Sequence, residues 1–131
     1  MFKKTIKYTD YNGVERTEAF YFNLSPADLI DMEVESGGYK QMLQNIIESQ
    51  DVVSLMKAFK DIIRRSYGVK SSDGKHFVKT DENFLAFQST PAYSEMIMEF
   101  INDTDKAIEF VNGVMPTNVA TPALSVVSAE A

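Results

Sequence analysis

The side chains that most often carry out covalent or metal chemistry are scarce in this chain. It has no cysteine and a single histidine, His76, which excludes thiol nucleophiles, disulfides and the usual zinc sites. A catalytic histidine needs a nucleophile to serve and a partner to orient it. Ser71 and Ser72 lie near it in sequence, but serines are common in loops and do not by themselves indicate a nucleophile. We therefore interpret His76 as a structural or solvated residue and predict no enzymatic activity.

Two other short motifs resemble ligand sites only superficially. Asp73-Gly74-Lys75 offers backbone amides and a lysine, but it lacks the glycine spacing and the strand-to-helix context of a phosphate loop. Asp103 and Asp105 lack the glycine and the terminal glutamate of a calcium loop. A turn explains the first motif, and a helix cap with a first-turn acid explains the second. The sequence predicts no cofactor and no metal site.

Charge is unevenly distributed along the 131 residues. Thirteen basic and 19 acidic residues give a net charge of −6, with +1 on residues 1–79 and −7 on residues 80–131. An acidic half argues against nucleic-acid binding, which needs Lys and Arg to neutralise phosphates. No apolar run approaches the ~20 residues of a membrane span, and no export signal is present. We expect neither nucleic acid nor membrane as a partner.

The first 24 residues predict a β-hairpin. Phe2, Ile6 and Tyr8 share one face, and Asn12-Gly13 supplies residues that tolerate the positive φ of a tight turn. A lone hairpin is marginal in water. Its apolar face must therefore pack on other elements.

Residues 25–116 predict a series of short helices. Ser25-Pro26 has the pattern of a helix start, and Asn112-Gly113 is placed to end the last helix. We expect an α+β, mainly α fold, in which the hairpin packs on a bundle of about five to six helices. Residues 1–116 would form a single globular domain and residues 117–131 a flexible tail. The clearest stripes, both assigned to the core, are Tyr39, Met42, Leu43, Ile46 and Ile47, and Val52, Leu55, Met56, Phe59, Ile62 and Ile63.

Some surface features depart from this pattern. The outer face of the 52–66 helix is basic, which is typical of a solvated surface; ion pairing with the acidic half of another copy is the alternative. Four apolar residues fall outside the predicted core stripes, which favours either a surface that another protein covers or a wider core. These candidate partner-binding residues are Leu85, Met98, Phe110 and Met115.

Three stretches together resemble a known family. They are FKKTIKYTDYNG (residues 2–13), SYGVKSSDGKHF (66–77) and FVNGVMP (110–116). Their order, their spacing and the total length are similar to those of the tail assembly chaperones of siphophages that infect Gram-positive bacteria. The resemblance spans about residues 1–116.

The resemblance implies a non-enzymatic role in the host-cell cytoplasm. Such chaperones bind the long, helical tape measure protein, keep it soluble and help tail-tube subunits assemble around it, and they are generally absent from the virion. The tail-tube protein and a second copy of this chain are further candidate partners. Many members are also made in a longer, frameshifted form, and the tail, with Glu130 as its one charged residue, would suit a linker into such an extension.

Two other function classes stay open at this point. A structural virion component, such as a tail terminator or a head–tail connector, would persist in purified particles. A small acidic inhibitor of a host protein would carry a clustered acidic face. The negative charge of residues 80–131 is compatible with such a face.

Overall fold

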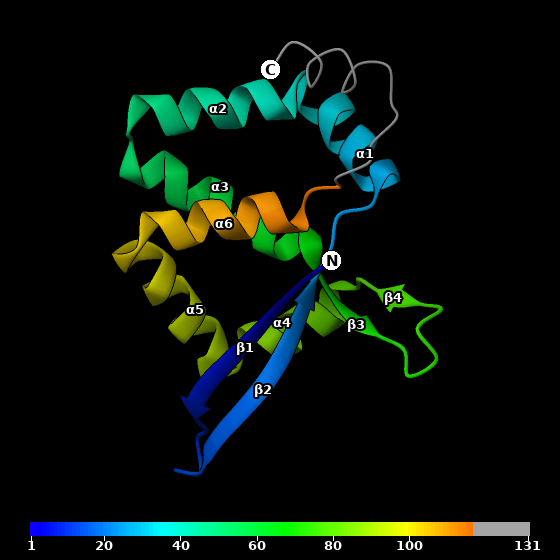
Figure 1. The fold of residues 1–131 in the computed structure, drawn as a ribbon, viewed down its shortest axis with the longest axis vertical. Coiled ribbons are helices and arrows are strands. Elements are labelled where there is room, and N and C mark those ends of the chain that lie inside the picture. The colour runs from blue at the N-terminus through cyan, green and yellow to red at the C-terminus, as the bar shows by residue number, and fades with distance from the viewer. Residues whose placement is uncertain (117–131) are drawn as a thin grey trace.

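The structure is a computed structural model that describes residues 1–116. A β-hairpin extends from one end of the molecule, and helices form the rest (Figure 1). In chain order the elements are β1 (Phe2–Thr9), β2 (Glu15–Phe22), α1 (Pro26–Ser36), α2 (Tyr39–Ser49), α3 (Val52–Ser66), β3 (Tyr67–Lys70), β4 (Phe77–Val78), α4 (Asp81–Gln88), α5 (Pro91–Asn102) and α6 (Thr104–Val114). The predicted α+β, mainly α class is confirmed.

The hairpin forms as the sequence predicts. β1 pairs antiparallel with β2 along its whole length, from Phe2 opposite Phe22 to Thr9 opposite Glu15. In the turn, Gly13 has a φ of 81°. β3 adds to the last two residues of β2, and β4 adds to β3, giving a four-stranded sheet of order β1-β2-β3-β4.

Side-chain caps fix where several helices begin. The Ser25 hydroxyl accepts a hydrogen bond from the Asp28 amide, and the Asp28 carboxylate accepts one from the Ser25 amide, at 3.1 and 2.9 Å. Asp51, Thr80 and Asp103 accept from backbone amides at the starts of α3, α4 and α6. Each cap satisfies donors that the helix itself leaves unpaired, so these boundaries are set locally.

An aromatic cluster joins the hairpin to the helices. Phe22 is fully buried, and its ring centroid lies 5.2 Å from that of Phe110 and 5.8 Å from that of Phe87. Phe2 packs edge-on against Phe110 at 5.3 Å. An ion pair of 2.5 Å between Lys4 and Glu99 adds a contact between β1 and α5. Apolar burial therefore fixes the hairpin on α4 and α6.

Gly113 does not end the last helix, and that prediction is wrong. α6 continues through it to Val114. A Cβ placed on Gly113 would lie 2.3 Å from Cδ2 of Phe2. Glycine is needed here because the Phe2 ring lies directly against the helix backbone.

The predicted flexible tail, residues 117–131, lies outside the described residues. Within residues 1–116, no helix has the length and apolarity that crossing a bilayer requires.

Candidate partner-binding surface

The four candidate residues from the sequence fall into three environments. Leu85 and Met98 are exposed, by 60% and 50%, whereas Phe110 is fully buried and Met115 is half-buried against the core. The expectation that Phe110 lies outside the core is wrong. α6 contacts α3, α5 and β1, so it is covered on more sides than a single apolar stripe assumes.

Leu85 and Met98 are not brought to one pocket. Leu85 lines a hollow between α3, α4 and α5 together with Lys60 and Tyr93. Met98, on α5, is not among the residues that line this hollow. Their role in partner binding stays a prediction.

Helix α2 buries much less of its apolar stripe than predicted. Tyr39 and Leu43 are buried, but Met42 and Ile47 are 39% and 37% exposed and Ile46 is half-buried. The core assignment of this stripe is therefore correct only in part. The apolar stripe stays partly exposed because of where α2 lies. This helix packs mainly on α1 and α3, at the end of the molecule opposite the hairpin tip (Figure 1).

The first turn of α3 shows the same excess of apolar surface. Val52, assigned to the core, is 66% exposed, and its neighbour Val53 is 65% exposed. Farther along α3, Phe59, Ile62 and Ile63 are almost completely buried. The apolar stripe of α3 is thus core at one end and surface at the other.

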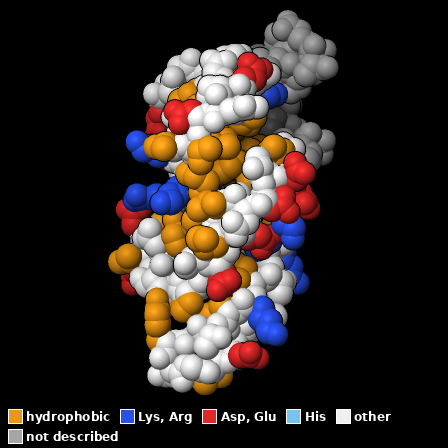
Figure 2. Space-filling view, turned by 90° about the vertical axis from the view of Figure 1, so that its left-hand side faces the viewer, with side chains coloured by type: hydrophobic (Ala, Val, Ile, Leu, Met, Phe, Trp, Pro, Cys, Tyr) orange, Lys and Arg blue, Asp and Glu red, His pale blue; other side chains and the backbone are white. Residues whose placement is uncertain are grey.

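The turns that join α2 to α3 and α5 to α6 lie on the same side of the molecule (Figure 1). Figure 2 views the side where α2 turns into α3 and α5 turns into α6, and it shows hydrophobic side chains gathered across that face. Ile47, Val52 and Val53 lie at the first turn, and Ile101, 48% exposed, lies near the second. Clustered apolar surface of this kind typically marks an interaction site.

A hollow of about 310 Å³ lies between α2 and α3. Tyr39 and Ala58, which are buried, contribute to it together with the more exposed Met42 and half-buried Ile46. We call this the α2–α3 groove. It is lined by Tyr39, Met42, Ile46, Ser54, Lys57, Ala58 and Asp61. Its volume is at the lower end of the range for small-molecule sites.

The acid in the groove is already neutralised. Asp61 accepts a hydrogen bond from the Tyr39 hydroxyl at 3.1 Å and forms an ion pair with Arg65 at 2.9 Å. Burial and the nearby Asp61 raise the pKa of Tyr39 above its ordinary value, which favours the protonated hydroxyl that donates to Asp61. Arg65 also reaches Glu35 at 3.1 Å, which links α1 to α3.

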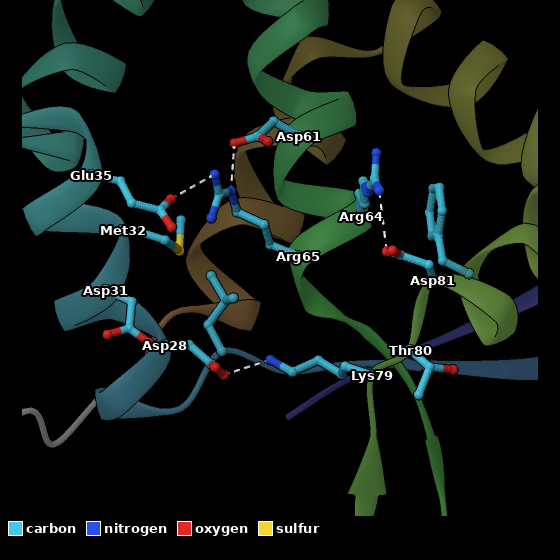
Figure 3. Close-up of a pocket in the computed structure, with 12 residues that line it drawn as sticks. Asp28, Asp31, Met32, Glu35, Asp61, Arg64, Arg65, Lys79, Thr80 and Asp81 are labelled. Atoms are coloured by element: carbon cyan, nitrogen blue, oxygen red, sulfur yellow. Dashed lines mark hydrogen bonds and ion pairs between the residues drawn. The ribbon is translucent and has the colours of Figure 1, made fainter.

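A second cleft, of about 490 Å³, is polar and lies between α1, α3 and the start of α4 (Figure 3). Its charges pair with one another across the cleft: Lys79 with Asp28 at 2.5 Å, and Arg64 with Asp81 at 3.1 Å. Burial raises the pKa of Asp28, but hydrogen bonds from Lys79 and Ser25 outweigh it and keep that pKa below the ordinary value. These contacts hold the elements together.

Metal-ligating side chains do not gather in the part of the chain that is described. Residues 1–116 contain no group of three or more His, Cys, Asp or Glu placed to hold a metal ion. His76 is exposed in the β3–β4 connection, where its amide donates to the Ser71 hydroxyl oxygen. That contact belongs to the turn around Gly74, which has a φ of 76°.

Comparison with known families decides the class of protein. A family model described as phage tail assembly chaperone matches residues 1–129. The chain belongs to the phage tail assembly chaperone family. The match continues past residue 116, where the resemblance was expected to end. Comparisons with curated proteins and with solved structures gave no match. In this tail assembly chaperone, the α2–α3 groove is the hollow that is bordered by the exposed apolar side chain of Met42 and the half-buried Ile46.

Proposed function

We propose that this tail assembly chaperone binds the tape measure protein of its phage, keeps it soluble and assists tail-tube assembly around it. The role is non-enzymatic and takes place in the host-cell cytoplasm, and the chaperone leaves before the virion is complete. The observation that carries the proposal is the half-exposed apolar stripe of α2 beside the α2–α3 groove. Membership of the chaperone family supports it.

The physical mode is a helix laid into a groove. A helical client presents apolar side chains at i, i+3, i+4 and i+7, and these would cover Met42, Ile46 and Ile47. Burying one such side chain completely stabilises a contact by about 1.5–3 kcal/mol, and here each is already partly covered. A single site is therefore weak.

Weak sites suit a long client. If apolar stripes recur along the tape measure protein, many chaperone copies bind along it. Covering those stripes prevents the client from aggregating through them. The growing tail tube can then displace each weakly bound copy in turn.

Co-expression with the tape measure protein from the same genome tests the proposal. The client should become soluble and co-purify with the chaperone. Met42→Glu should abolish both effects, because it places a charge where the client's apolar stripe would pack. Met98→Glu is the comparison variant, since it adds the same charge at an exposed methionine outside the groove, on the alternative surface that the sequence predicted. It should leave both effects in place if the groove is the binding surface.

Two results would overturn the proposal. One is a client whose solubility is unchanged by the chaperone, together with detection of this protein in purified virions by mass spectrometry; a structural tail component then takes its place. The other is retention of client binding by Met42→Glu and its loss in Met98→Glu, which would move the binding surface to α5.

A further inference from the structure

We infer that the outer half of β2 pairs with the same strand of a second copy of this chain, antiparallel and around a twofold axis at Thr17. The two hairpins then form one continuous sheet, in which the two β2 strands are neighbours. This inference goes beyond the proposed function and does not depend on it. Three observations carry it: an unpaired strand edge, the charges along that edge and a hollow beside it.

The outer half of β2 has a neighbouring strand on one side only. β1 pairs with β2 along its whole length, whereas β3 pairs only with Tyr21 and Phe22. Figure 1 shows β3 and β4 turning away from the outer half of the hairpin. Residues 15–19 are all exposed, and within residues 1–116 no strand pairs with them on the side opposite β1. We call residues 15–19 the β2 edge.

The backbone of the β2 edge is oriented to accept another strand. The Asn23 amide donates to the Ser66 carbonyl oxygen at 2.7 Å, on the side of β3. Backbone groups alternate between the two sides of a strand, so the amides and carbonyls of Glu15, Thr17 and Ala19 face that same side. Such a row of donors and acceptors is a template for pairing with another chain.

The charges on this edge are complementary to themselves. When Thr17 lies opposite Thr17 of the second copy, Arg16 lies opposite Glu18 of that copy, and symmetry forms the same pair twice. Edge strands commonly carry charges that discourage pairing. Here opposite signs two residues apart favour a second copy in this one register, because opposite charges on directly facing residues stabilise a sheet.

Both charged side chains have atoms left for a second copy. Arg16 donates through Nε to Asp10 at 2.6 Å and is half exposed, so its terminal amino groups can reach a further carboxylate. Glu18 accepts from the Tyr8 hydroxyl through Oε1, which leaves Oε2 for an arginine. The contacts within one hairpin therefore orient the two side chains without using them up.

A hollow of about 290 Å³ lies where the turn of the second copy arrives. It is bordered by Ala19–Tyr21 of β2 and by residues 67–72 of β3 and the connection that follows. In the same register Val14 of the second copy lies opposite Phe20. Val14 and Tyr11 are 52% and 82% exposed in the single chain. Covering the hollow with this turn buries apolar surface that is otherwise in water.

Thiol crosslinking tests the position of the twofold axis. The chain has no cysteine, so Thr17→Cys carries one thiol per copy. Facing residues at a hydrogen-bonded position have Cα atoms about 5.5 Å apart, within the span of a disulfide. Mild oxidation should therefore link Thr17→Cys into a dimer. Thr5→Cys is the matched control, since it is exposed on β1 and lies at least about 14 Å from its counterpart.

Sedimentation velocity of charge variants tests the register. Arg16→Glu and Glu18→Arg should each weaken dimerisation at least about tenfold, because symmetry replaces two ion pairs with two repulsions. Mixed in equal amounts, the two variants should associate with each other, since every carboxylate then faces an arginine. Lys7→Glu makes the same change in net charge as Arg16→Glu at an exposed position on β1, and it should dimerise like the unaltered chain. Circular dichroism confirms that the variants are folded.

Three results would overturn the inference. They are a chain that stays monomeric at its highest soluble concentration, a dimer that both charge variants leave intact, and a mixture of the two variants that does not associate. Binding of a tape measure segment to the β2 edge of a monomeric chain is one form of the first result. Failure of the proposed function is read separately, as an insoluble client in co-expression, because α2 lies at the end of the molecule opposite the hairpin tip (Figure 1).

Discussion

The contact between Phe2 and Gly113 leads to a prediction whose sign depends on the background. A Cβ on Gly113 would lie 2.3 Å from Cδ2 of Phe2, 3.1 Å from Cε2 and 3.3 Å from Cγ, whereas ordinary contacts are 3.4–4 Å. Gly113→Ala therefore forces the Phe2 ring to move by about 1 Å or more. The ring cannot move freely, since it packs edge-on against Phe110.

The expected magnitude follows from two opposing effects. Alanine is favoured over glycine by about 1 kcal/mol in a helix interior, and by no more than that at Gly113, the next-to-last residue of α6. Overpacking costs about 1–3 kcal/mol, and weakening the aromatic contact costs about 0.5–1.5 kcal/mol more. The clash is the larger effect, so Gly113→Ala should lower the free energy of unfolding by about 1–2 kcal/mol. For a domain of this size the fall in Tm is about 5 °C.

Removing the ring should reverse the sign. In a Phe2→Ala background the space is empty, so adding Gly113→Ala should raise the free energy of unfolding by about 0.5–1 kcal/mol through helix propensity. Urea denaturation of the four proteins, followed by circular dichroism, measures the cycle. Stabilisation by Gly113→Ala in both backgrounds would contradict the packing described here.

Three further predictions concern single residues. Gln50 ends α2 with a φ of 57°, a conformation that glycine adopts more easily than glutamine. Gln50→Gly should therefore raise the free energy of unfolding, measured by urea denaturation, by about 0.5 kcal/mol. A loss of stability would contradict backbone strain at this turn. Asp28 has a lowered pKa in the folded state; its contribution to stability is present above its unfolded pKa and is lost as pH falls through the folded pKa. Urea midpoints should therefore fall at pH below about 4, with a smaller fall in Asp28→Asn; an equal fall would refute this role. Phe110→Ala should lower the free energy of unfolding by about 3–5 kcal/mol, and Met98→Ala should lower it by less than about 0.5 kcal/mol. Similar losses of stability in the two variants would contradict the burial of Phe110.

Local signals were sufficient for much of the fold. The Asn12-Gly13 turn and the caps at Ser25, Asp51 and Asp103 depend on residues close in sequence, so hairpin and helix starts could be predicted. The role of Gly113 could not, because it depends on Phe2 at the other end of the chain. Phe110 was assigned wrongly because a single-stripe pattern does not register that α6 is covered on several sides.

The candidate surface was harder to predict for a physical reason. A helix that packs into its own core and a helix that awaits a partner have the same apolar period. The stripe containing Met42 and Ile47 therefore indicated a core helix, and only the placement of α2 at the end of the molecule shows how much of it is exposed.

Photo-crosslinking tests most directly whether the tape measure protein binds in the α2–α3 groove. A benzophenone amino acid replaces Met42 in one variant and Met98 in another, and each variant is co-expressed with the tape measure protein and irradiated. We expect a covalent adduct with the tape measure protein from position 42 and little or none from position 98. Adduct formation at position 98 with none at position 42 would contradict the account.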